Sequence, residues 1–173
     1  MKRLQTQSGF TLLETLIYIA LFALLSILLI SSLVALLRSY TETRAQHDVL
    51  DSARISMERM TREIRGASSV DTAASTLGSS PGVLKLNTTD ASGTAKTVQF
   101  SVSSNVLKLL DSVDGTTRDL TGSKVSITSL TFRNITTTAG SAVRVEMTIQ
   151  EMRGGSSGRS FDFYDTVALR GSY

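Results

Sequence analysis

Residues 8–37 read SGFTLLETLIYIALFALLSILLISSLVALL. From Thr15 to Leu37 this stretch carries no formal charge, and it contains neither Pro nor Gly after Gly9. At about 1.5 Å per residue, a helix over the charge-free part spans roughly 35 Å, which is enough to cross a hydrocarbon core of about 30 Å. The stretch therefore predicts a membrane-length α-helix near the N-terminus.

One carboxylate, Glu14, lies at the head of this apolar run. A lone charge in such a place is costly and generally has a functional reason. The ordinary alternative is a surface acid that snorkels to the membrane interface near a helix end. Lys2 and Arg3 precede the run and favour an N-terminus in the cytoplasm, with the C-terminal domain outside. Arg38 and Arg44 weaken that charge asymmetry.

Composition excludes several classes of function. The chain has 173 residues, enough for one modest domain beyond the apolar run, and it has no Cys, so a thiolate nucleophile, a Cys-based metal site and a disulfide scaffold are excluded. The formal net charge is +3, and no basic stripe with interleaved aromatic residues predicts a direct nucleic-acid surface. A single His argues against a hydrolase. We therefore predict a protein that is not an enzyme and needs no cofactor.

A cleaved secretory signal is one alternative for the apolar run. Its apolar part is normally about 7–15 residues long and is followed by a small-residue cleavage site. Here the run is longer, and Ser31-Ser32 is followed at once by further apolar residues. The length favours a retained helix.

The hexapeptide Gly9-Phe10-Thr11-Leu12-Leu13-Glu14, behind a short basic leader, resembles the N-terminus of type IV pilins and type II secretion pseudopilins. The resemblance implies that a prepilin peptidase cuts between Gly9 and Phe10 and then methylates Phe10. It also implies that Glu14 is the acid that the family carries near the new terminus. Gly9 has no side chain, so a protease can approach its backbone closely.

Cleavage would create a cation at Phe10, one helical turn from Glu14. An unpaired buried carboxylate costs several kcal/mol. In a filament of packed helices, the Phe10 amine of a neighbouring subunit can offset that cost. We therefore expect Glu14 to favour the correct axial register between subunits.

Two further segments resemble minor pilins and J-type minor pseudopilins more loosely. They are MERMTREIR at residues 57–65 and TVALR at residues 166–170. The resemblance implies an inner-membrane precursor that is assembled into a type IV pilus or a type II secretion pseudopilus, in an initiation or tip complex. A DNA-uptake pilus is also open. The implied partners are the peptidase, other pilin or pseudopilin subunits, the inner-membrane assembly platform and membrane lipid.

A different class of protein is the main alternative to a filament subunit. An unprocessed, single-span anchor could carry an extracytoplasmic domain that binds a ligand or partner. The two hypotheses differ in whether the leader is removed.

The helix is expected to continue beyond the membrane. Apolar residues recur at spacings of 4, 4, 3 and 4, which place them on one helical face; they are Val49, Ala53, Met57, Met60 and Ile64. Glu58 precedes Arg62 by four residues, a favourable orientation for an ion pair. Gly66 suits a helix end.

The rest of the chain is expected to form a β domain. A loop at Ser68–Gly82 precedes alternating segments at Val83–Leu86, Val98–Val102, Val106–Leu110, Val125–Arg133, Ala142–Met152 and Phe161–Leu169. Ser103-Ser104-Asn105 and Gly154–Gly158 are expected to be hairpin connections. The predicted fold class is α+β, with a long helix packed on an antiparallel sheet. Its parts are a leader (1–9), an apolar helix (10–37), its amphipathic continuation (38–67) and a β-rich domain (68–173).

A weak calcium candidate lies between two of the predicted strands. Asp111, Asp114 and Asp119 flank Gly115, but their spacing does not match an EF-hand. An ordinary polar turn is the preferred interpretation, and the sequence predicts no metal site.

Overall fold

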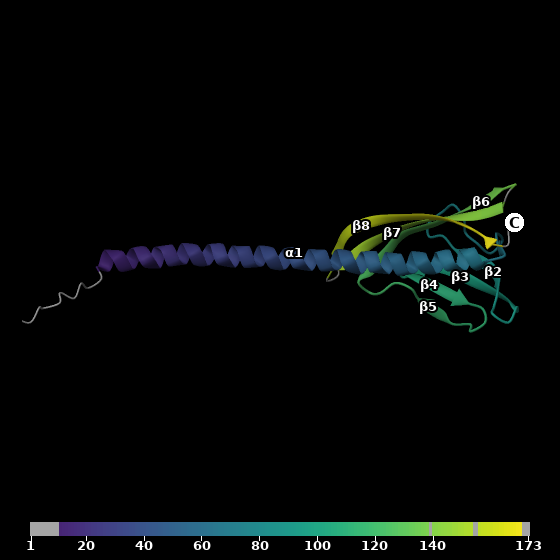
Figure 1. The fold of residues 1–173 in the computed structure, drawn as a ribbon, viewed down its shortest axis with the longest axis horizontal. Coiled ribbons are helices and arrows are strands. Elements are labelled where there is room, and N and C mark those ends of the chain that lie inside the picture. Colours follow the sequence, from purple (N-terminus) through teal and green to yellow (C-terminus); the bar gives the residue numbers. More distant parts are fainter. Residues whose placement is uncertain (1–10, 139, 154–155, 171–173) are drawn as a thin grey trace, which may run out of the picture. The chain divides into compact units, whose positions relative to one another are not determined.

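In the described residues, one long helix is followed by eight strands. The computed structural model describes residues 11–138, 140–153 and 156–170. Helix α1 (Leu12–Gly66) is 55 residues long and continues without a break through Ser31 and Ser32 (Figure 1). The predicted helix end at Gly66 is confirmed. The chain divides into two compact units, Met1–Arg44 and Ala45–Tyr173, and the boundary between them falls within α1.

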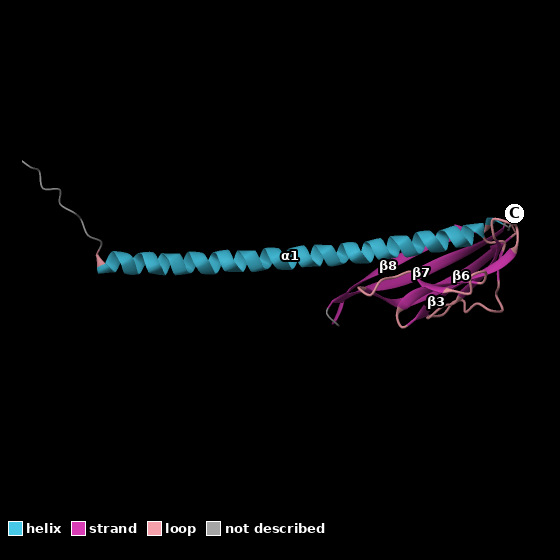
Figure 2. Ribbon diagram, turned by 90° about the horizontal axis from the view of Figure 1, so that it is seen from below, coloured by secondary structure: helices cyan, strands magenta, loops and turns pink. Residues whose placement is uncertain are grey.

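The strands form two antiparallel sheets in the second unit, where a single sheet was expected. A five-stranded sheet has the order β1-β2-β3-β4-β5, and a three-stranded sheet has the order β6-β7-β8. The strand bounds are β1 (Ser69–Val70), β2 (Leu84–Thr89), β3 (Ala95–Ser103), β4 (Val106–Asp111), β5 (Thr117–Asp119), β6 (Val125–Thr137), β7 (Gly140–Arg153) and β8 (Ser156–Ala168). The α+β class, with a helix on antiparallel strands, is confirmed (Figure 2).

The core lies between the second part of α1 and the inner faces of both sheets. Helix residues Val49, Ala53, Met60 and Ile64 are fully buried, as the spacing predicted, and Met57 is partly buried. On β7, the alternating apolar residues are all buried; they are Val143, Val145, Met147 and Ile149. The alternation of apolar residues on the strands and their helical spacing on α1 therefore predicted most of the core.

Four polar contacts attach α1 to the β domain at intervals along its length. Lys124 Nζ lies 2.8 Å from Asp48 Oδ2, and the Ser56 hydroxyl donates to the Leu120 carbonyl at 3.5 Å. Thr61 Oγ1 donates to Asp165 Oδ2 at 2.7 Å, and Thr88 Oγ1 donates to the Gly66 carbonyl at 3.2 Å. The partners come from β2, from β8 and from the connection between β5 and β6. The helix is therefore held by both sheets.

The predicted loop at Ser68–Gly82 is wrong in part. It contains β1, which pairs with β2, and Thr76 forms a bridge with Val83. The amides of Gly78 and Gly82 also donate to the carbonyls of Phe132 and Leu130 on β6, at 2.8 and 2.7 Å. The segment covers part of the outer edge of β6, which would otherwise expose unpaired backbone groups. Its Ser, Thr and Gly content concealed these pairings.

The hairpin predicted at Ser103-Ser104-Asn105 is confirmed as the β3–β4 connection. Ser104 and Asn105 both have positive φ, 53° and 61°, as a tight hairpin turn requires. The other expected connection, Gly154–Gly158, is shorter than predicted, because β8 begins at Ser156; residues 154–155 lie outside the described residues. Two register shifts, between Ile127 and Ser129 and between Gln150 and Met152, were not predicted.

Candidate functional site

Glu14 lies in the first turn of α1. Its backbone amide donates to Thr11 Oγ1 at 3.3 Å, so Thr11 acts as the helix N-cap and Glu14 occupies the third helical position. An acid at this position also interacts favourably with the helix dipole. The sequence Thr-x-x-Glu is the pattern of a capping box. Glu14 therefore has a local role in starting the helix, besides any role between subunits.

Tyr18 is a functional candidate that sequence reasoning missed. Its hydroxyl donates to Glu14 Oε1 at 2.9 Å, one turn further along α1. The signal was present in the sequence, because residues four apart on a helix are neighbours and a Tyr can reach an acid at that spacing. The contact gives the lone carboxylate a hydrogen-bond donor from its own helix.

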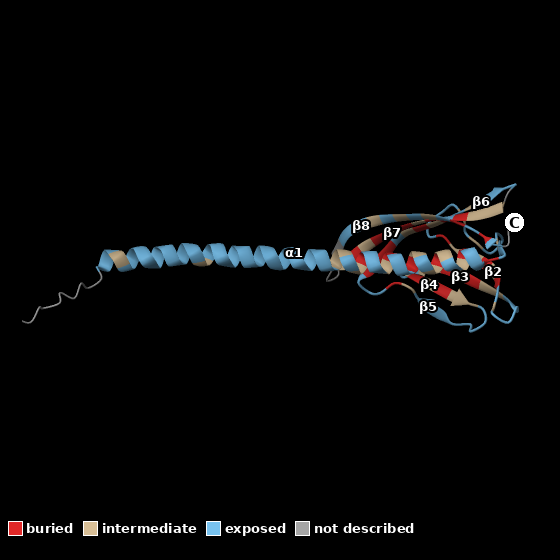
Figure 3. Cartoon of the chain, viewed as in Figure 1, coloured by how far each residue is buried: buried red, intermediate tan, exposed pale blue. Residues whose placement is uncertain are grey.

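The apolar part of α1 has no cover within the described chain. Between Leu12 and Leu37 every large apolar side chain is exposed, from 41% for Val34 to 82% for Leu12 (Figure 3). Among the described residues, α1 is the one helix that is long and apolar enough to span a membrane by length and composition. A continuous apolar surface of this extent requires a bilayer or partner helices.

Three hydroxyl side chains within the apolar segment bond to the helix itself. The hydroxyls of Thr15, Ser26 and Ser31 donate to backbone carbonyls three or four residues earlier, at 2.8, 2.8 and 2.9 Å. Such bonds remove the cost of placing a hydroxyl in an apolar medium. Glu14 therefore remains the one formally charged side chain between residues 11 and 37.

The predicted cleavage and methylation residues, Gly9 and Phe10, lie outside the described residues, as do the leader cations Lys2 and Arg3. Both assignments remain predictions.

The structure does not bring the three aspartates of the weak calcium candidate together. Each carboxylate has a different cation: Asp111 contacts Lys96 at 3.0 Å, Asp114 contacts Arg118 at 2.6 Å, and Asp119 contacts Lys108 at 2.8 Å. No group of three metal-ligating side chains gathers anywhere in the described part of the chain.

Asp111 instead orders the turn that follows β4. Its Oδ1 accepts the Val113 amide at 3.0 Å and its Oδ2 accepts Lys96 Nζ. The Val113 hydrogen bond, together with Lys96, holds the pKa of Asp111 below its ordinary value, against a smaller effect of burial. This is the geometry of a structural turn with an ionised carboxylate.

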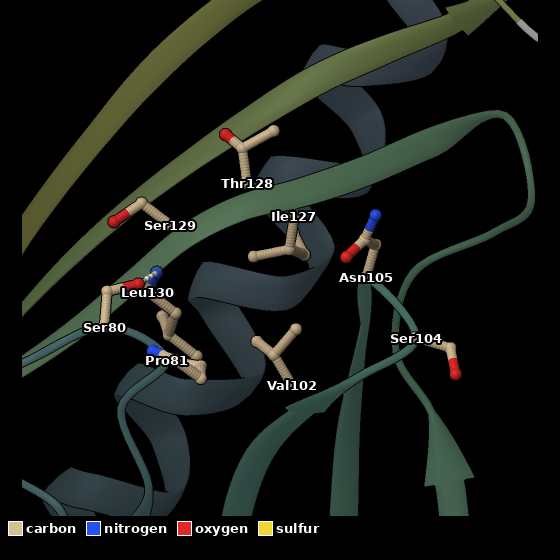
Figure 4. Close-up of a pocket in the computed structure, with 9 residues that line it drawn as sticks. All are labelled: Ser80, Pro81, Val102, Ser104, Asn105, Ile127, Thr128, Ser129 and Leu130. Atoms are coloured by element: carbon tan, nitrogen blue, oxygen red, sulfur yellow. Dashed lines mark hydrogen bonds between the residues drawn. The ribbon is translucent and has the colours of Figure 1, made fainter.

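A small hollow of about 300 Å³ lies beside the unpredicted bulge in β6 (Figure 4). It is bounded by the β3–β4 turn, by the segment at Ser80 and Pro81, and by β6 at residues 127–130. The Leu130 amide donates to Ser80 Oγ at 3.2 Å and the Ile127 amide to the Asn105 carbonyl at 2.8 Å. The residues that line it include no charged side chain.

Comparison with known proteins bears on the N-terminal segment alone. A family described as "Prokaryotic N-terminal methylation motif" matches residues 4–37, which include the predicted cleavage residues, Glu14 and Tyr18. No curated protein and no solved structure matches the chain. The apolar helix and this motif are together consistent with a single-pass anchor in the inner membrane. The chain thus carries, at residues 4–37, the N-terminal methylation motif that is typical of type IV pilins and pseudopilins.

Proposed function

We propose that this protein is a minor pilin or pseudopilin. A prepilin peptidase removes residues 1–9 and methylates Phe10, and the mature chain assembles with other subunits in a type IV pilus or a type II secretion pseudopilus. The observation that carries the proposal is the methylation motif at the head of α1, whose large apolar side chains between Leu12 and Leu37 are exposed. The looser likeness of residues 57–65 and 166–170 supports a place in an initiation or tip complex.

Glu14 is the residue that we assign to subunit register. In the membrane its carboxylate accepts the Tyr18 hydroxyl of its own helix, and its backbone amide donates to the Thr11 cap. These contacts supply no positive charge. A neighbouring subunit's methylated Phe10 amine supplies that charge, and a wrong axial register leaves the carboxylate without it.

Mass spectrometry of the membrane-extracted protein tests the proposal. The expected mature chain begins at methylated Phe10. A chain that still begins at Met1 in cells with an active prepilin peptidase refutes the proposal and favours an unprocessed anchor with an external binding domain. A Gly9→Leu variant is the control, since a bulky residue there should leave the precursor uncut, visible as a larger species on a gel.

Recovery of the mature chain in a sheared filament fraction tests assembly separately. Cross-linking to the other subunits of that fraction then distinguishes an initiating or tip position from a position along the shaft. Uniform incorporation along the filament would overturn the tip assignment and would leave the processing step intact.

A further inference from the structure

A second hollow, of about 450 Å³, lies at the C-terminal end of α1. Arg62 and Arg65 are one turn apart on the helix, and Arg170 reaches the same hollow from the chain after β8. We name these three residues the arginine trio. The complete lining is Glu58, Thr61, Arg62, Arg65, Gly66 and Arg170.

The arginine trio has no ion-pair or hydrogen-bond partner in the described part of the chain. Arg62 does not pair with Glu58, although their spacing favoured a pair; Arg59 and Glu63 form the neighbouring pair instead, at 2.7 Å. Asp165 on β8 forms no ion pair with the trio; its two oxygens accept the Thr61 hydroxyl at 2.7 Å and the Thr166 amide at 2.8 Å. Three arginines without an ion pair therefore line one hollow together with a single carboxylate, that of Glu58.

A role in capping the helix explains only part of this arrangement. A cation in the last turn interacts favourably with the helix dipole, which accounts for Arg65. It does not account for Arg170, which belongs to a different element more than a hundred residues later. Like charges repel, an anion between them offsets that repulsion, and guanidinium groups bind carboxylates through paired hydrogen bonds.

We propose that the arginine trio binds an acidic segment of a neighbouring subunit. The hollow is too large for one carboxylate and has room for more than one side chain of a peptide. This inference rests on the proposed function, because the methylation motif implies that the chain assembles with other subunits. Glu58 borders the hollow and opposes an acidic ligand, so it limits the affinity and disfavours ligands of low negative charge.

The test uses the full mature chain in a non-ionic detergent, with a fluorescent oligoglutamate peptide as the probe. Replacing the trio together (Arg62→Gln, Arg65→Gln and Arg170→Gln) should weaken binding by about tenfold or more. Arg54→Gln is the matched control, because Arg54 is also exposed on α1 but does not line the hollow. Glu58→Gln should instead strengthen binding, a change of opposite sign that a loss of folding cannot mimic.

Three outcomes of the peptide assay overturn the proposal. They are equal binding by the trio variant and wild type, an Arg54→Gln loss as large as that of the trio variant, and displacement of the peptide by inorganic phosphate at the same charge concentration. Trio-dependent binding to anionic phosphatidylglycerol vesicles, with no binding to the peptide, overturns it in favour of a lipid site.

Cells that express the trio variant separate this inference from the proposed function. We expect a normally processed N-terminus and reduced incorporation into filaments. A chain that begins at Met1 refutes the proposed function itself. Normal processing with wild-type incorporation refutes only the inference about the trio.

Discussion

Thr61 Oγ1 donates a 2.7 Å hydrogen bond to Asp165 Oδ2, joining α1 to the last strand across 104 residues of sequence. The bond is partly buried, and the Asp165 carboxylate also accepts the Thr166 amide. Beside this contact lies the arginine trio, which the Asp165 carboxylate leaves unpaired. The Thr61–Asp165 hydrogen bond therefore stabilises the helix on the sheet, and the arginine trio is left available to a partner.

Thr61→Val should lower the free energy of unfolding of the β domain by about 1–3 kcal/mol, because it leaves the partly buried carboxylate without this donor. Chemical denaturation of the full chain in detergent measures the change. Thr166→Val, at the exposed neighbouring position, should stay within about 0.5 kcal/mol of wild type. Equal losses for the two variants would show that the Thr61 bond contributes nothing specific.

Glu14→Ala should leave cleavage after Gly9 largely intact and impair assembly. The substitution removes the carboxylate that we pair with a neighbour's Phe10 amine, while the Thr11 cap hydroxyl remains. Mass spectrometry of the N-terminus and the yield of sheared filaments measure the two effects. Incorporation equal to wild type would contradict the role of charge pairing in register.

Tyr18→Phe should reduce the steady-state amount of unassembled protein in the membrane, because it removes the hydroxyl that donates to Glu14. That hydrogen bond stabilises the helix by about 1–2 kcal/mol. Pulse–chase labelling measures the loss. Tyr40→Phe, on an exposed tyrosine of the same helix, is the matched control. In a Glu14→Ala background the Tyr18 effect should vanish; an undiminished effect would show that Tyr18 acts elsewhere.

Gly82→Ala should destabilise the β domain by roughly 1–3 kcal/mol through overpacking. A Cβ at Gly82 would lie 2.9 Å from the Leu130 carbonyl oxygen and 3.1 Å from the Phe132 ring, while the Gly82 amide is bonded to that same carbonyl. Gly122→Ala is the control, since a Cβ there meets nothing within 4 Å. Thermal unfolding of both variants measures the difference, and equal midpoints would contradict the close approach.

The stabilising effect of Asp111 on the β domain should be lost in acid. Its folded-state pKa is lowered by the Val113 hydrogen bond and Lys96, so its stabilising effect is present above the unfolded pKa of about 3.8 and is lost as the pH falls through the folded pKa. Asp111→Ala should therefore cost about 1 kcal/mol at neutral pH and much less below pH 3. Urea denaturation across this range measures it, with Asp114→Ala as the exposed control. A cost independent of pH would contradict ionisation as the cause.

Local patterns were sufficient for much of the fold. The spacing of Val49, Ala53, Met60 and Ile64 predicted the buried face of α1, and strict alternation predicted the inner face of β7. Residues 68–82 were mistaken for a plain loop, because their pairing to β2 and β6 depends on distant backbone partners and leaves no periodic apolar signal. The register shifts of the β6–β7 and β7–β8 pairs were missed for the same reason.

By itself, the sequence determined the membrane-length helix, the lone acid Glu14 and the methylation motif, because each depends on residue type and spacing within one continuous segment. Tertiary structure alone decided that Asp111 pairs with Lys96 and Asp119 with Lys108, and that Arg170 joins Arg62 and Arg65 at one hollow. Charged side chains act over a few ångströms, and only the folded chain brings residues so far apart in sequence within that distance.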